Sequence, residues 1–178
     1  MLLSGCITSS RGVGPRTEVD QLGDALEKLH QGVCPTEAQA IARGAFQHAG
    51  QLADRYRAVR PAWLHNVFVN AGVRDRGLCY HWANDLDTHL TSLGADTLEI
   101  YLCAARVGTF REHNALVVTA CDQPFETGIV LDAWRRSGRL YWGRVCEDKF
   151  PWLPLENERT RVEGDFCHLT AAALTAEH

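Results

Sequence analysis

Residues 77–83 read Gly77-Leu78-Cys79-Tyr80-His81-Trp82-Ala83 and place a cysteine directly after a glycine turn, at the start of a helical pattern. Apolar residues then recur at spacings of four, four and three, which predicts an amphipathic helix over residues 79–93. A helix N-terminus offers unpaired N–H groups and the positive end of the helix dipole. Both favour a thiolate over a thiol, so Cys79 is the first candidate for a nucleophile. The apolar stripe consists of Trp82, Leu86, Leu90 and Leu93, with Asn84, Asp85, Asp87 and Thr88 expected on the outer side.

Beyond Gly94 the period of the apolar residues changes from helical to extended. Strands are predicted over residues 97–107, 112–120, 127–133 and 139–145, with turn-forming residues between them. Such short connections favour antiparallel pairing. The fold class is therefore expected to be α+β, with the cysteine-bearing helix packed on an antiparallel sheet.

Two further helices are expected before the central one. The pattern predicts them over residues 17–30 and 35–59, and residues 62–77 are interpreted as a loop that leads into the central helix. We expect residues 1–16 to be a tether and residues 17–178 to be one domain. Within it, residues 17–60 would form a helical lobe and residues 61–178 the core.

Composition narrows the possible functions. The chain has 178 residues and a net charge of −4, which argues against nucleic-acid binding. Its seven cysteines contain no C-x-x-C pair, so a closed zinc site is not expected, and nothing indicates an organic cofactor. An alternative metal site would combine Cys79 and His81 with His113 and Asp132. It is disfavoured because residues two apart on a helix point about 200° away from each other.

His113 and Asp132 each stand within an apolar, strand-like run. Neighbouring antiparallel strands lie about 4.8 Å apart, so two side chains on one face can form a hydrogen bond. A cysteine nucleophile needs a base, and the base needs a third group to orient it. Cys79, His113 and Asp132 are therefore expected to form a catalytic triad, although each residue alone would more readily be explained by packing.

This arrangement resembles the transglutaminase-like and papain-like cysteine peptidase superfamily. Its members carry Gly-x-Cys-aromatic at the start of a central helix, then a histidine entering one strand, then an aspartate on the next before an aromatic residue. Here the matching segments are 77–80, 113–117 and 131–134, within a resemblance that covers residues 63–152. It implies that Cys79 is the nucleophile, His113 the base and then the acid, and Asp132 the orienting carboxylate. The chain departs from the family pattern in having Tyr80 where tryptophan is commoner and no upstream glutamine for an oxyanion hole.

Further residues complete the expected site. The amides of Asn66 and Asn70, in the lead-in loop, are the nearby candidates for an oxyanion donor beside the Cys79 N–H. Trp134 is expected to form a wall of the cleft beside Asp132. Arg135 and Arg136 are interpreted as a solvated turn.

The first residues resemble a bacterial lipobox. The tetrapeptide Leu3-Ser4-Gly5-Cys6 is followed by a polar stretch, although no basic or apolar signal segment precedes it. Either the true start lies further upstream or the match is accidental, and the first alternative, a truncated lipoprotein, is the expectation. Lipidation of Cys6 would anchor the protein in the bacterial cell envelope, at the periplasmic face, and membrane contact is expected through this anchor alone. Without lipidation the protein is expected to be soluble.

The expected function is acyl transfer by a thiol, most simply hydrolysis of an amide or peptide bond, with a cell-wall peptide as one possible substrate. The alternative is a non-catalytic envelope lipoprotein that has kept the fold for binding or assembly. Alkylation of Cys79 distinguishes the two, because only the enzyme needs an activated thiol.

Overall fold

The computed structural model describes residues 17–155. These residues contain four α-helices and a sheet of five strands, so the expected α+β class is confirmed. The helices are α1 (Glu18–Glu27), α2 (Pro35–Tyr56), α3 (Ala62–Asn70) and α4 (Cys79–Thr91). The strands are β1 (Leu98–Ala105), β2 (His113–Ala120), β3 (Ile129–Asp132), β4 (Tyr141–Arg144) and β5 (Trp152–Pro154), and two short 3-10 turns are η1 (Phe125–Thr127) and η2 (Val145–Glu147).

Local backbone and capping interactions define the start of α1 and both ends of α2. The Thr17 hydroxyl accepts from the Asp20 N–H, and the Asp20 carboxylate accepts from the Thr17 N–H, which forms a capping box at the start of α1. Pro35 opens α2, where a missing N–H costs nothing. Helix α2 ends at Tyr56, because Arg57 adopts a left-handed conformation with φ of 50°.

All strands pair antiparallel, in the order β4-β3-β2-β1-β5. The four predicted strands are confirmed, with no bound shifted by more than two residues. The fifth strand was not predicted: β5 returns along the free edge of β1, with Cys103 opposite Pro154 and Ala105 opposite Trp152. Three residues are too few for a recognisable alternation, which is why the sequence pattern did not reveal this strand.

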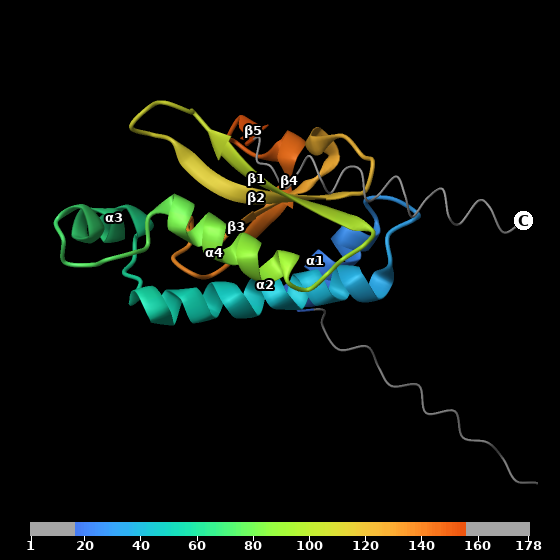
Figure 1. Ribbon diagram of the computed structural model, residues 1–178, viewed down its shortest axis with the longest axis horizontal. Coiled ribbons are helices and arrows are strands. Elements are labelled where there is room, and N and C mark those ends of the chain that lie inside the picture. The colour runs from blue at the N-terminus through green and yellow to red at the C-terminus, as the bar shows by residue number, and fades with distance from the viewer. Residues whose placement is uncertain (1–16, 156–178) are drawn as a thin grey trace, which may run out of the picture.

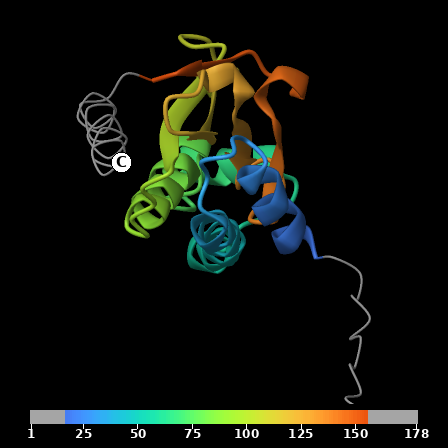
Figure 2. The same ribbon diagram turned by 90° about the vertical axis from the view of Figure 1, so that its right-hand side faces the viewer.

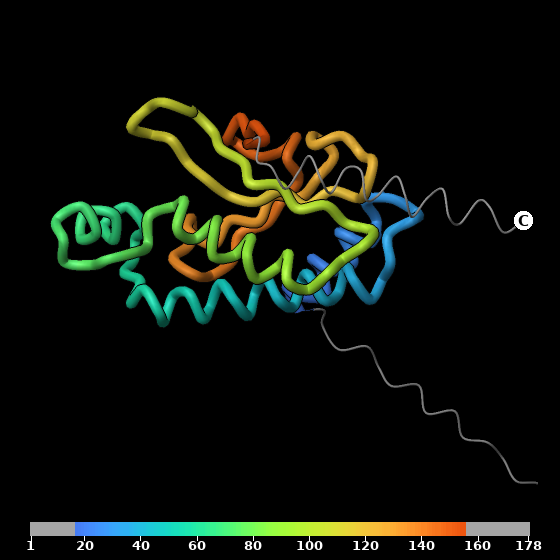
Figure 3. Tube along the Cα trace, in the orientation of Figure 1, coloured from blue at the N-terminus to red at the C-terminus, as the bar shows by residue number. Residues whose placement is uncertain are grey.

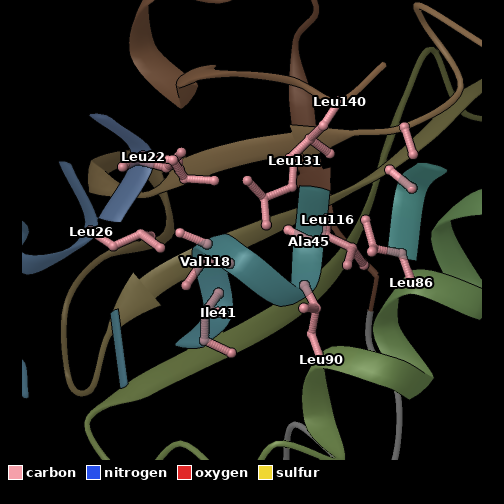
Figure 4. Close-up of a cluster of buried hydrophobic side chains, with 14 of the residues drawn as sticks. Leu22, Leu26, Ile41, Ala45, Leu86, Leu90, Leu116, Val118, Leu131 and Leu140 are labelled. Atoms are coloured by element: carbon pink, nitrogen blue, oxygen red, sulfur yellow. The ribbon is translucent and has the colours of Figure 1, made fainter. Parts of the chain in front are cut away.

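Helices cover one face of the sheet. Figures 1 and 2 show α1, α2 and α4 side by side on that face, with α2 spanning most of the length of the molecule. Figure 4 shows the main core, where Ile41 and Ala45 of α2 meet Leu86 of α4 and Leu116 of β2. A second, smaller core lies on the opposite face and contains Cys103, Ala105, Ala115, Val117, Val130, Val145 and Trp152.

The lead-in segment differs from its prediction. Residues 62–70 form helix α3 rather than a loop, and the chain then returns from the far end of α3 to the start of α4 (Figure 3). The pattern was missed because α3 buries only Ala62 and His65, which leaves no apolar stripe to recognise.

Two details of α4 also differ. Leu93 lies after the end of the helix and is 41% exposed, so the apolar stripe stops at Leu90. Asp87, expected on the outer side, is buried, and its carboxylate accepts a hydrogen bond from the Thr91 hydroxyl at 3.5 Å. Short polar side chains within a helix can be buried when a neighbour one turn away provides a donor.

Candidate active site

Cys79 is the first residue of α4 and its side chain lies over the start of β2. The thiol contacts the Asn114 Oδ1 at 3.4 Å and the Glu112 carbonyl oxygen at 3.9 Å. The residue is half-buried, so the sulfur is held by the protein yet remains partly accessible. As the first helical residue, Cys79 also has a backbone N–H without a partner inside the helix.

Gly77 allows the helix to begin at this point. Its φ is +122°, and a Cβ at this position would lie 2.1 Å from the Nε2 atom of His65. The buried His65 ring accepts from the Val59 N–H and donates through Nε2 to the Arg76 carbonyl. Only glycine combines this backbone conformation with so close an approach.

His81 caps the start of α4 from within the helix. Its Nδ1 atom accepts from the N–H groups of Gly77 at 3.1 Å and Leu78 at 3.2 Å. Burial, together with the positive charge of Arg76, lowers the pKa of His81, which keeps the ring neutral and able to accept. This histidine therefore faces the preceding backbone and not the Cys79 thiol.

His113 and Asp132 meet on the face of the sheet opposite the helices. Val117 lies opposite Val130 in the register of β2 and β3, so by alternation His113 and Asp132 point to the same side as this pair. The His113 Nε2 donates to the Asp132 Oδ2 at 2.6 Å, and both side chains are almost fully buried. The predicted proximity of these two residues is confirmed.

The protonation of His113 follows from its partners. Burial alone would lower the pKa of His113, but hydrogen bonds with Asp132 and with Cys79, and the negative charge of Asp132, raise it to about 9. Because Nε2 is bonded to Asp132, Nδ1 is the nitrogen that serves Cys79. At neutral pH the His113 ring is an imidazolium between a carboxylate and a thiol.

Aromatic rings enclose the imidazole. The ring centroids of Trp134, Phe150 and Trp152 lie 4.8, 4.9 and 5.4 Å from that of His113. Trp134 thus lies beside the site as predicted. Such an enclosure excludes water, which strengthens the electrostatic interactions within it.

Arg135 was wrongly interpreted as part of a solvated turn. Its Nε donates to the Asp132 Oδ2 at 2.9 Å, its backbone N–H donates to the Asp132 Oδ1 at 2.9 Å, and its Nη2 donates to the Asp148 Oδ2 at 2.9 Å. The guanidinium also lies 3.7 Å from the ring centroid of Tyr141. Arg136, by contrast, is exposed, as expected of a turn.

These contacts keep Asp132 ionised although it is buried. Burial by itself would raise the pKa of Asp132, but the hydrogen bond from His113 and the positive charges of His113 and Arg135 hold it below its usual range. Asp132 is therefore a carboxylate that can orient the imidazolium of His113. Three of its hydrogen-bond donors come from only two residues, which restricts its rotation.

Asn66 and Asn70 lie on helix α3, not on a loop. The Asn66 Oδ1 accepts from the Trp134 indole N–H at 3.0 Å, so this amide is tied to the aromatic wall of the site. Asn70 is exposed at the last residue of α3. Of the two candidates for an oxyanion donor, only Asn66 is thus linked to the residues around His113.

Asn114 is a site residue that the sequence interpretation missed. It follows His113 directly, so in a regular strand the two side chains point to opposite faces. Both nevertheless reach Cys79, because the thiol lies at the start of β2, where Asn114 approaches from the helix side and His113 from the other. The clue in the sequence was the polar pair at the start of an otherwise apolar strand.

Other candidate features do not form a metal centre. Among residues 17–155, no group of three or more histidine, cysteine, aspartate or glutamate side chains is arranged to hold a metal ion.

Cys103 lies within β1, where burial raises the pKa of its thiol, so this cysteine is a small core residue. No helix in the described part of the chain is long and apolar enough to cross a bilayer. Cys6 and its lipobox lie outside the described residues.

The site combines a thiol at a helix N-terminus with a buried imidazolium and a carboxylate on two neighbouring strands. This is the set of groups that acyl transfer through a thioester requires. Comparison with protein-family models, with curated proteins and with solved structures gives no match to this chain. Any function is therefore inferred from the geometry of the site.

Proposed function

We propose that the protein transfers acyl groups through a thioester on Cys79, with hydrolysis of an amide or peptide bond as the overall reaction. The observation that supports this most directly is the buried His113 imidazolium, held between the Asp132 carboxylate and the Cys79 thiol. A histidine placed only for packing would not need two polar partners in an aromatic enclosure. We also propose a papain-like or transglutaminase-like core, since α4 carries Cys79 and two successive strands carry His113 and Asp132.

In the proposed mechanism, the Cys79 thiolate attacks the carbonyl carbon of the substrate and forms a tetrahedral intermediate. His113 then donates its Nδ1 proton to the departing amine as the carbon–nitrogen bond breaks, which leaves a thioester on Cys79. Water attacks the thioester while His113 accepts a proton from it. The carbon–sulfur bond breaks, the acid product leaves, and the thiolate–imidazolium pair is restored.

The negative charge that develops on the carbonyl oxygen needs donors. The unpaired N–H of Cys79 at the start of α4 supplies one, and the helix dipole adds to its effect. The Asn66 Nδ2 is our candidate for a second donor, because the Oδ1 of the same amide is fixed by Trp134. Asn114 can also stabilise the thiolate if its amide turns to place Nδ2 against sulfur, since oxygen and nitrogen of this group occupy equivalent positions.

The cellular setting is part of the proposal. Lipidation at Cys6, within Leu3-Ser4-Gly5-Cys6, would hold the protein at the periplasmic face of the bacterial envelope. A peptide of the cell wall is then the amide substrate we propose. The anchor and the substrate rest on the sequence motif and on the chemistry of the site.

Site-resolved alkylation tests the activated thiol. The protein is treated with iodoacetamide at about pH 6, and labelling of each cysteine is followed by peptide mass spectrometry. Cys146 is exposed and free and is the internal reference. Cys34 needs attention, because hydrogen bonds from the Thr36 hydroxyl and the Glu37 backbone lower its pKa, so the assay uses a Cys34→Ser background. We expect Cys79 to react at least about tenfold faster than Cys146.

The matched variant is His113→Gln, checked for folding by circular dichroism. It should bring labelling of Cys79 down to the rate of Cys146, because the thiolate loses its counter-ion. The proposal fails if Cys79 of the unmodified site reacts no faster than Cys146. It also fails if the folded His113→Gln protein keeps the fast rate. Either outcome would favour a binding or assembly lipoprotein that carries out no thiol chemistry.

A further inference from the structure

A polar cavity lies between the end of α2 and the segment that leads to α4. Its volume is about 370 Å³, which is at the lower end of the range for small-molecule sites. The lining includes four arginines, Arg55, Arg57, Arg74 and Arg76, but only one carboxylate, Asp75. This excess of positive charge occurs in a chain whose net charge is −4, so it is a local feature and not a reflection of composition.

Two of the four arginines pair with a carboxylate within the protein. The Arg76 Nη2 lies 2.7 Å from the Asp85 Oδ1, and the Arg55 Nη1 lies 3.8 Å from the Asp85 Oδ2. The Tyr56 hydroxyl also donates to the Asp85 Oδ2, at 2.6 Å. One carboxylate on α4 thus serves two guanidinium groups and a phenol.

Arg57 and Arg74 have no such partner within the described residues: no carboxylate oxygen of residues 17–155 lies within 4.0 Å of either guanidinium. The Nε of Arg74 is buried and has no hydrogen-bond partner, whereas its Nη1 donates to the Val73 carbonyl at 3.1 Å. An anion in the cavity would offset the charge of the two guanidinium groups that line it without a carboxylate partner.

We propose that this cavity binds a small anion with several negatively charged oxygens, held by the guanidinium groups of Arg57 and Arg74. Guanidinium forks match the oxygens of phosphate and carboxylate groups, and both chemistries fit the arginine set. The size of the cavity limits the ligand to a compact molecule, such as a phosphate ester of a small metabolite or a di- or tricarboxylate.

The anion site is separate from the thiol. Helix α4 packs between α2 and the sheet. Asp85 lies on the side of α4 that faces α2, where it contacts Tyr56 at the end of α2. The Cys79 sulfur lies against Asn114 of β2. The proposal therefore does not depend on thioester chemistry, and a Cys79→Ser protein should bind the anion with unchanged affinity.

Isothermal titration calorimetry of the full chain tests the proposal, with inorganic phosphate and citrate as two separate probes at constant ionic strength set by NaCl. We expect saturable binding of at least one probe: phosphate alone would indicate a phosphorylated ligand and citrate alone a polycarboxylate. The Arg57→Gln and Arg74→Gln double variant should weaken binding at least about tenfold. Arg57→Gln alone, at an exposed position, should weaken it to a smaller extent with the fold unaffected.

Arg43→Gln is the matched control, because it removes the same charge from an exposed position of α2 away from the cavity. It should leave the affinity unchanged. The proposal is overturned if neither anion binds saturably, if the folded double variant binds as well as the unaltered protein, or if Arg43→Gln weakens binding equally. Alkylation of Cys79 in the same preparations tests the thiol proposal separately, so failure of one proposal can be distinguished from failure of the other.

Discussion

Arg135 links two buried carboxylates that lie far apart in the sequence, Asp132 and Asp148. Its side chain is 14% exposed, whereas those of both aspartates are fully buried. Removing one partner of such a pair leaves buried charge without compensation, which is far more costly than the net value of the pair itself. The orientation of Asp132, and through it that of His113, thus depends on a residue that takes no part in the proposed reaction itself.

We therefore expect Arg135→Gln to lower the free energy of unfolding by about 3 kcal/mol. Urea denaturation followed by circular dichroism measures the change. Arg136→Gln removes the same charge from the neighbouring exposed position, and it should alter the free energy by no more than about 0.5 kcal/mol. Equal effects of the two variants would show that Arg135 does not hold the buried carboxylates.

Among single residues, the sequence predicts those whose place in a strand pattern sets their direction, and it misses those whose role depends on contacts between distant segments. His113 and Asp132 interrupt apolar strands, so their parity indicates a shared face, and the 2.6 Å contact agrees with that. Arg135 and Arg136 look alike in sequence. Their surroundings in the fold distinguish them, because Arg135 contacts Asp132 and also Asp148, which the segment after β4 brings near.

The start of α4 is the element on which the candidate site depends, and His81 holds it through a neutral ring nitrogen. Protonation of Nδ1 would remove the acceptor for the Gly77 and Leu78 N–H groups. Because the pKa of His81 is lower in the folded than in the unfolded chain, the unfolded chain binds the proton more readily. The stabilisation from this cap is therefore present above about pH 6.5 and is lost as the pH falls below it.

The variant His81→Asn keeps a side-chain acceptor but does not titrate. We expect its free energy of unfolding to fall less than that of the unaltered protein between about pH 7.5 and pH 5.5, as measured by urea denaturation. An unchanged pH dependence in His81→Asn would contradict our account.

The helices and strands with the clearest apolar periodicity are the ones that the sequence predicts best. Helix α2 buries Ala38, Ile41 and Leu52 along one stripe and was identified with its start correct and its end within three residues. Helix α3 and strand β5 were missed, because the first has an exposed Trp63 and Val67 and the second has three residues. Their positions depend on contacts with other elements, which no local pattern encodes.

Alternation along the strands divides the whole molecule into two cores that share one sheet. Leu116 points to the helices and Val117 to the opposite face, so each strand contributes to both. The helical lobe of residues 17–60 packs on α4 through α2, and α1 also contacts β2 of the same sheet. A single cooperative unit is the natural consequence of such sharing.

We expect Leu52→Ala in α2 to cost about 2–5 kcal/mol and Val117→Ala in β2 at least about 1.5 kcal/mol, because both side chains are fully buried. Both variants should shift one transition, with coincident urea curves from tryptophan fluorescence and far-ultraviolet circular dichroism. Leu153→Ala is the control, since that side chain is 59% exposed and its loss should change the free energy by no more than about 0.5 kcal/mol. Separate transitions for the two probes would show that the lobe unfolds independently.

The aromatic enclosure of His113 also affects the rate at which its ring proton exchanges with solvent. The proton on Nε2 is shared with a fully buried carboxylate and surrounded by the rings of Trp134, Phe150 and Trp152. It can exchange with solvent hydrogen only when those rings move apart. The exchange lifetime of this proton, measured by nuclear magnetic resonance, therefore reports how often the interior beside the thiol opens. The measurement requires no substrate.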